Sequence, residues 1–258
     1  MPDTSVLASK WQHMACTLDG GPAANVAVGL ITLSNDTVIE PELYTFLPRD
    51  GVAVYSSRIP MAAQVSVAAL KDMRRDLSRV AAEILPDDKI DVMAFGCTSG
   101  SMAIGPDNVI SEVQKSKPGI PVTNPVSASL KGLRALGIKR IALLTPYPDA
   151  VNEIVENYVG GEGFDIVVRG SFKQKGDPQI TRVPPEAIYE AGVALGKHKD
   201  AQGLFISCTA LRCSPVIQRI EDAIGKPVVT SNQALAWDCL RLGGYQNAVP
   251  GYGRLMTI

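Results

Sequence analysis

Two segments of this 258-residue chain repeat one pattern, an apolar run that ends in Cys-Thr. The first segment spans residues 91–101 and contains Cys97, and the second spans residues 202–212 and contains Cys208. The match continues downstream, where Gly-Ile-Pro-Val in the first copy corresponds to Gly-Lys-Pro-Val in the second. A repeat of this length predicts two similar half-domains that face each other, with one cysteine reaching their interface from each side.

Short apolar runs recur along the chain and alternate with helix-like stretches. Continuous apolar strands separated by helices of about ten residues or more are typical of parallel sheets covered on both faces, which places the chain in the α/β class. Proline, asparagine or acidic residues mark the starts of several helices. The predicted strands are 26–31, 52–55, 90–95, 141–144, 166–168, 203–206 and 228–229, and the predicted helices are 127–136, 150–158, 187–197 and one that ends near 242.

The repeat also predicts how the chain is divided. Residues 1–24 read as an arm with little fold of its own. We expect residues 25–128 to form the first lobe together with a returning carboxyl-terminal segment, 232–258. Residues 129–231 then form the second lobe.

Charge and hydropathy exclude several classes of partner. Lys and Arg number 25 against 26 Asp and Glu, and no basic cluster is interleaved with aromatic residues, which argues against nucleic acid. No signal-like leader and no apolar run of about 18 residues is present, so we expect no membrane partner and a soluble, cytoplasmic protein. Five cysteines, an odd number without a secretion signal, favour reduced thiols.

Cys97 and Cys208 are the candidate catalytic residues. A thiol at the carboxyl end of a strand, beside free N–H groups of a following helix, can be stabilised as a thiolate. A single cysteine in this setting is more simply a small buried hydrophobic residue, but two at matched positions of a repeat favour catalysis. Cys16, Cys213 and Cys239 read as structural or incidental.

Other catalytic arrangements lack the residues they need. The two histidines, His13 and His198, lie in polar or unremarkable contexts, which argues against a Cys-His or Ser-His-Asp hydrolase and against a zinc site. Neither a dinucleotide-binding nor a P-loop glycine motif is present, so no cofactor and no metal is predicted.

Hydroxyl groups near the two thiols are suited to binding a carboxylate. They are Thr98 and Ser99 after the first cysteine, Thr209 after the second, and Tyr147 in the turn after strand 141–144. Backbone N–H groups and hydroxyls in such turns can hold an anion without a full positive charge. Helix capping explains any one of them equally well, and their convergence on strand ends favours a small carboxylate substrate.

These motifs together resemble the aspartate/glutamate racemase superfamily, in the branch of maleate cis-trans isomerases, arylmalonate decarboxylases and related ectoine-utilisation proteins. The resemblance covers almost all of the chain after residue 25. Its carriers are residues 33–40 (LSNDTVIE), 96–100 (GCTSG), 145–147 (TPY) and 207–209 (SCT).

The resemblance implies two four-stranded parallel sheets, pseudo-twofold symmetry, a cofactor-free site between the lobes and a homo-oligomer. It makes Cys97 the nucleophile and Cys208 its acid/base partner. It also implies that the substrate is held by Thr98, Ser99, Tyr147 and Thr209, with Ser34, Asn35 and Asp36 lining the pocket.

The resemblance favours a cis-trans isomerase of a small dicarboxylate, because arylmalonate decarboxylases usually keep only the second cysteine. A racemase or a decarboxylase on the same scaffold is the alternative, and a non-catalytic small-molecule binder is another. Depending on register, Asp36 replaces Asn35 where maleate isomerases place a substrate-binding asparagine. A carboxylate there would repel a dianion or accept a hydrogen bond from an amino group, which leaves room for an amino-acid or amide-bearing substrate.

Overall fold

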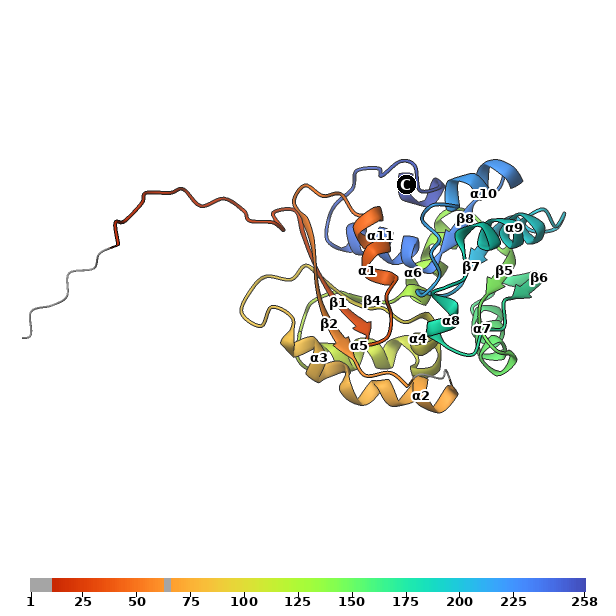
Figure 1. The fold of residues 1–258 in the computed structure, drawn as a ribbon, viewed down its shortest axis with the longest axis horizontal. Coiled ribbons are helices and arrows are strands. Elements are labelled where there is room, and N and C mark those ends of the chain that lie inside the picture. Colours follow the sequence, from red (N-terminus) through yellow and green to blue (C-terminus); the bar gives the residue numbers. More distant parts are fainter. Residues whose placement is uncertain (1–10, 63–65) are drawn as a thin grey trace, which may run out of the picture.

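The first half of the fold is a four-stranded parallel sheet. The computed structural model describes residues 11–62 and 66–258 (Figure 1). The strands are β1 (Val26–Leu33), β2 (Val52–Ile59), β3 (Val92–Phe95) and β4 (Val122–Thr123), in the spatial order β2-β1-β3-β4. Every residue of β1 and β3 is buried, as expected for the central strands of a sheet covered on both faces.

The second half repeats this sheet. Its strands are β5 (Arg140–Thr145), β6 (Asp165–Ser171), β7 (Gly203–Ile206) and β8 (Val228–Thr230), in the equivalent order β6-β5-β7-β8. All pairings in both sheets are parallel. The predicted α/β class with two pseudo-symmetric four-stranded sheets is therefore confirmed, and β3 and β7 are equivalent strands.

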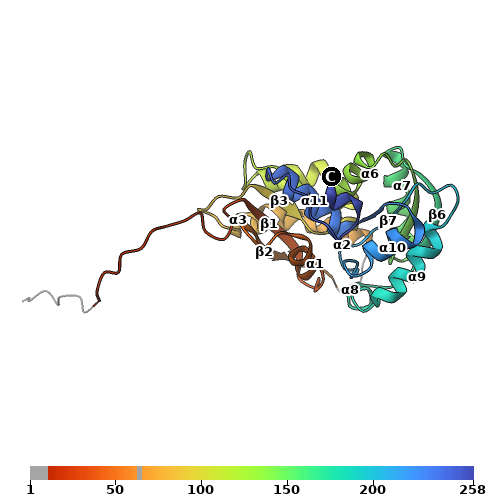
Figure 2. The same ribbon diagram turned by 90° about the horizontal axis from the view of Figure 1, so that it is seen from above.

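Helices connect the strands and flank both sheets (Figures 1 and 2). The four helices predicted from capping signals correspond to α6, α7, α9 and α11, and the seven predicted strand segments all overlap strands. The helices are α1 (Ile39–Phe46), α2 (Val67–Asp72), α3 (Leu77–Glu83), α4 (Thr98–Ile104), α5 (Pro106–Gln114), α6 (Pro125–Ala135), α7 (Asp149–Gly161), α8 (Asp177–Ile180), α9 (Pro185–Gly196), α10 (Ile217–Ile224) and α11 (Ser231–Leu242), with 3-10 turns at Met73–Asp76 and Arg254–Thr257.

Helix α11 returns from the second sheet to pack on elements of the first, namely α1, β3 and β4, and on α6. Asp238 of α11 is buried, accepts a hydrogen bond from the Thr123 hydroxyl of β4, and lies 3.0 Å from the Lys131 ammonium of α6. A buried carboxylate with two such partners fixes the helix in one position.

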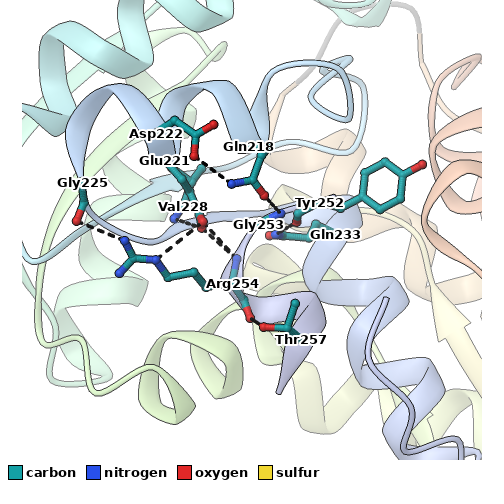
Figure 3. A network of polar contacts seen from close by, with 10 residues as sticks. All are labelled: Gln218, Glu221, Asp222, Gly225, Val228, Gln233, Tyr252, Gly253, Arg254 and Thr257. Atoms are coloured by element: carbon teal, nitrogen blue, oxygen red, sulfur yellow. Dashed lines mark hydrogen bonds and ion pairs between the residues drawn. The ribbon is translucent and has the colours of Figure 1, made fainter. Parts of the chain in front are cut away.

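The segment after α11 turns back to the second half of the molecule (Figure 3). Buried Glu221 of α10 accepts hydrogen bonds from the N–H groups of Val228 and Arg254, at 2.8 Å and 3.0 Å. The Gln233 side chain donates to the Tyr252 carbonyl at 2.6 Å. The carboxyl-terminal segment thus ties α11 to α10.

Residues 11–20 form no regular secondary structure, are exposed, and run away from the body of the molecule (Figures 1 and 2). Residues 1–10 of the predicted 1–24 arm lie outside the described residues, and the lobe boundaries at 128 and 232 stay predictions. Every helix within residues 11–62 and 66–258 is too short or too polar to span a lipid bilayer.

Candidate active site

Both repeat cysteines lie where an equivalent central strand ends, and they line the same pocket. Cys97 follows β3 after one residue, and Cys208 follows β7 after one residue. Their side chains are 4% and 5% exposed. The pocket is lined by Leu33, Met61, Leu70, Cys97, Thr98, Ser99, Tyr147, Asp177, Cys208 and Thr209.

Cys97 caps the amino end of α4. Its backbone is extended (φ −146°, ψ 114°), and its Sγ accepts a hydrogen bond from the Gly100 N–H at 3.3 Å. The Ser99 hydroxyl lies 3.9 Å from the same sulfur. A Cβ at position 100 would lie 2.9 Å from Sγ, so glycine is what allows this close approach.

Cys208 lies in a turn instead of at a helix start, because α10 begins only at Ile217. Its Sγ accepts from the Ala210 N–H at 3.4 Å, and its own N–H donates to the Ser231 hydroxyl at 3.0 Å. The Tyr147 hydroxyl is also hydrogen-bonded to this thiol. The expected helix N-terminus is therefore present at Cys97 and absent at Cys208.

The Tyr147 backbone is held in place by polar side chains of the second lobe. Its carbonyl accepts from the Asn152 amide at 2.9 Å and from the Ser171 hydroxyl at 2.8 Å. Asn152 in turn contacts the Thr145 hydroxyl at the end of β5. Tyr147 is 2% exposed, and the backbone that carries its phenol is held by these hydrogen bonds.

Burial dominates the electrostatics of the thiols. It raises the pKa of Cys97 from 9.0 to about 12, against the opposing effect of the Gly100 N–H. Burial likewise raises the pKa of Cys208; the charge of Asp177 adds to this rise, and the Tyr147 hydroxyl opposes it. The free space in the pocket is about 10 Å³, room for about one water molecule. In this closed arrangement burial therefore favours the neutral form of both thiols.

Two hydroxyls beside the thiols link the repeats. The Thr98 hydroxyl donates to the Ser231 hydroxyl at 2.9 Å, and the Thr209 hydroxyl lies 3.5 Å from the Gly96 carbonyl. The Asn232 amide donates to the Thr209 carbonyl at 2.8 Å. Of the three predicted Ser and Thr ligands, Ser99 is therefore the one whose hydroxyl is least engaged by the protein.

The 34–36 segment lies beside the pocket, and none of its residues is part of the lining. Asp36 is 1% exposed, and its Oδ1 caps α1 by accepting from the N–H groups of Val38 and Ile39 at 2.7 Å and 3.0 Å. Burial raises the pKa of Asp36, although these N–H groups oppose the rise. The Asn35 amide is buried without a partner among the described residues, and Ser34 is exposed. Their contact with substrate stays a prediction.

Asp177 is a pocket residue that sequence reasoning missed, together with Leu33, Met61 and Leu70. It begins the short helix α8 after β6, within a Gly-Asp-Pro turn that has no distinctive motif. A usable signal was the repeat itself, because Met61 and Asp177 follow the equivalent edge strands β2 and β6. The equivalence of β2 and β6 points to the loops after those strands as pocket segments, but it does not single out Met61 or Asp177 within them.

Two facing parallel-sheet lobes with a cysteine at the end of each equivalent central strand define a class of two-lobed cysteine enzymes. The chain belongs to the arylmalonate decarboxylase family, whose model matches residues 37–256. The resemblance predicted from the sequence motifs is thus confirmed.

Individual relatives include both activities named in that prediction. The maleate isomerase of Geobacillus stearothermophilus is 26% identical over 91% of this chain and 98% of its own length. The arylmalonate decarboxylase of Bordetella bronchiseptica is 38% identical over 53% of this chain and 58% of its own. A Nocardia farcinica maleate cis-trans isomerase mutant with a covalently bound succinylcysteine intermediate matches with a TM-score of 0.79 and 26% identity, covering 90% of this chain and 98% of that one. The expectation of an enzyme with cysteine chemistry is confirmed by these relatives.

Proposed function

We propose that this protein is a cofactor-independent cis-trans isomerase of a small four-carbon carboxylate, with Cys97 as nucleophile and Cys208 as acid/base partner. The observation that carries the proposal is that both thiols, from equivalent ends of β3 and β7, line one nearly closed pocket. Similarity to maleate isomerases, one of them with a covalently bound succinylcysteine intermediate, supports the same chemistry.

The proposed cycle starts after Cys97 has released its proton to solvent, with Cys97 as a thiolate and Cys208 as a thiol. The Cys97 sulfur bonds to one alkene carbon, and the π electrons move to the neighbouring carbon, which takes the proton of Cys208. The former double bond is now single and rotates. Cys208 then removes the proton, the double bond re-forms in the trans geometry, and the C–S bond breaks to restore the Cys97 thiolate.

The residues around the thiols fit these roles. The Gly100 N–H stabilises negative charge on Cys97, and the Tyr147 hydroxyl and Ala210 N–H stabilise it on Cys208. We assign the carboxylate end of the substrate to the Ser99 hydroxyl, with Thr98 and Thr209 as further donors. Closure of the pocket excludes water that would otherwise protonate the carbanion.

Decarboxylation or racemisation is the second candidate, favoured by the family model and by the 38% identity to an arylmalonate decarboxylase. Decarboxylation needs one proton donor on one face of the carbanion, and Cys208 alone supplies that. A third candidate function for the same pocket is the binding of a small molecule without catalysis.

Proton NMR time courses in D₂O, with maleate, each aspartate enantiomer and phenylmalonate supplied separately, distinguish these activities. We expect fumarate from maleate, and no fumarate when Cys97→Ser or Cys208→Ser is used. Cys239→Ser is the matched control, since Cys239 is buried in α11 and does not line the pocket. Full turnover by Cys97→Ser would exclude the two-thiol mechanism, and phenylmalonate loss without fumarate would assign decarboxylation.

Our proposal for the cellular setting is a homo-oligomer in the cytoplasm, with the cysteines reduced. It is supported by the family resemblance and by five cysteines of which none is paired in a disulfide. Native mass spectrometry of the purified chain measures the oligomeric state, and a monomer at micromolar concentration would overturn that part.

A further inference from the structure

Asp177 is a buried acid that the mechanism above does not use. It is 6% exposed, lines the pocket that holds both thiols, and its Oδ2 has no hydrogen-bond partner among the described residues. Leaving a buried carboxyl oxygen without a donor is unfavourable by about 1–3 kcal/mol. Such an atom at a binding pocket indicates that the ligand supplies the missing donor.

Among the described residues, no positively charged side chain in the pocket compensates this acid. Among the described residues that line the pocket, none is Lys, Arg or His. Arg58 interacts with Asp36, but its guanidinium donates to the Leu33 and Asp36 carbonyls and pairs with Glu40. Asp36 is itself an acid whose charge acts on Asp177.

A dicarboxylate would therefore meet like charge at this end of the pocket. Two carboxylates at close range in a poorly hydrated site repel each other strongly, because screening by water is lost. An N–H-bearing group has the opposite effect, since it donates to the carboxylate and carries no negative charge.

We propose that Asp177 determines specificity by accepting a hydrogen bond from a carbamoyl N–H, so that the preferred substrate carries one carboxylate and one amide instead of two carboxylates. This inference rests on the proposed isomerase function in one respect. An alkene that receives a thiolate needs an electron-withdrawing carbonyl, and a carbamoyl group keeps that carbonyl, whereas an ammonium group at the same place does not.

The test compares three cis-alkene substrates with the wild-type protein and the isosteric variant Asp177→Asn, by kcat/KM for isomerisation. The substrates are maleate, its monoamide and its monomethyl ester. We expect the wild type to prefer the monoamide over maleate by roughly tenfold to a hundredfold, the scale of one hydrogen bond to a charged group. The ester, which is uncharged at that end but has no N–H, should fall below the monoamide. Asp177→Asn, whose amide can donate to a carboxylate, should shift the ratio toward maleate by a similar factor.

A higher kcat/KM for maleate than for the monoamide in the wild type, or a ratio of the two that Asp177→Asn leaves unchanged, would overturn the inference. Equal kcat/KM values for the ester and the monoamide would also overturn it, because they would show that Asp177 excludes a second charge without accepting a hydrogen bond. Asp177→Ser repeats the test if Asp177→Asn does not fold.

Thermal shifts of the wild type with the saturated analogues succinate and succinamate test the inference separately from the isomerase proposal, because neither compound can isomerise. A larger shift with succinamate supports the inference even if no alkene is turned over, and a larger shift with succinate overturns it.

Discussion

The hydroxyl of Thr98 donates to the hydroxyl of Ser231 at 2.9 Å, across a sequence separation of 133 residues. The Ser231 hydroxyl also accepts the N–H of Cys208 at 3.0 Å. The residue that follows one thiol is therefore connected, through a single serine at the start of α11, to the backbone of the other. The bridge from Thr98 through Ser231 to Cys208 thus couples the positions of the two thiols.

Ser231→Ala should destabilise the protein and lower turnover. The buried Cys208 N–H and the Thr98 hydroxyl both lose their partner, so we expect the free energy of unfolding to fall by about 1–3 kcal/mol. Denaturant unfolding and initial rates measure the two effects. Ser129→Ala is the matched control, because Ser129 is equally buried and its hydroxyl has no partner among the described residues. Equal losses in the two variants would contradict a role for the bridge.

Gly100→Ala should displace the first thiol. The added Cβ would lie 2.9 Å from the Cys97 Sγ and 2.5 Å from the Met73 Cε. Met73 can move, but Sγ is held by the N–H of the substituted residue, so we expect kcat to fall by roughly a hundredfold for a displacement of about 1 Å.

Gly160→Ala in α7 controls for the intrinsic effect of glycine in a helix, since nothing lies within 4 Å of its Cβ position. That variant should keep its activity and gain up to about 1 kcal/mol in stability. Unchanged kcat in Gly100→Ala would show that the close approach is not needed for catalysis.

The stability of the protein should decrease as pH rises through the titration of Asp177. Burial, and secondarily the charge of Asp36, raise the pKa of Asp177 from 3.8 to about 6. The folded state therefore binds the Asp177 proton more tightly than the unfolded state does. The resulting loss of folding stability is absent below about pH 4 and complete above about pH 6. Two pKa units correspond to about 3 kcal/mol.

Asp177→Asn should remove this dependence and stabilise the protein at pH 8 while leaving it nearly unchanged at pH 4. Urea unfolding of both proteins between these pH values measures the difference. A constant difference between variant and wild type across the range would be inconsistent with a raised pKa.

Gly253→Ala should loosen the carboxyl-terminal segment shown in Figure 3. Gly253 has φ +81°, and a Cβ would lie 2.8 Å from Ile217 and 2.9 Å from the Glu221 carboxylate. Gly251→Ala carries the same kind of backbone strain at φ +95° with nothing within 4 Å. We expect both variants to lose about 1–2 kcal/mol from strain, and Gly253→Ala to lose more from the steric contact. Thermal unfolding compares them, and equal losses would exclude that contact.

The strands and the two thiols could be predicted because their signals are local. Apolar runs such as those before Cys97 and Cys208 report burial on both faces of a sheet, and the repeat reports that their ends are equivalent. Asp177 could not be predicted in this way, because an acid in a Gly-Asp-Pro turn is usually solvated. The raised thiol pKa values likewise depend on pocket closure, which arises from contacts between segments distant in sequence. The Ser231 bridge is of the same kind.

The two lobes share a backbone plan, but their contributions to the pocket walls are chemically different. The first half of the chain contributes the apolar Leu33, Met61 and Leu70 besides the polar Thr98 and Ser99, whereas the second half contributes Tyr147, Asp177 and Thr209 and no aliphatic side chain. A pseudo-twofold cleft with identical walls would accept a ligand in two orientations and present either prochiral face to a given thiol. Unequal walls remove that degeneracy, so any reaction that sets a stereocentre here should yield a single enantiomer.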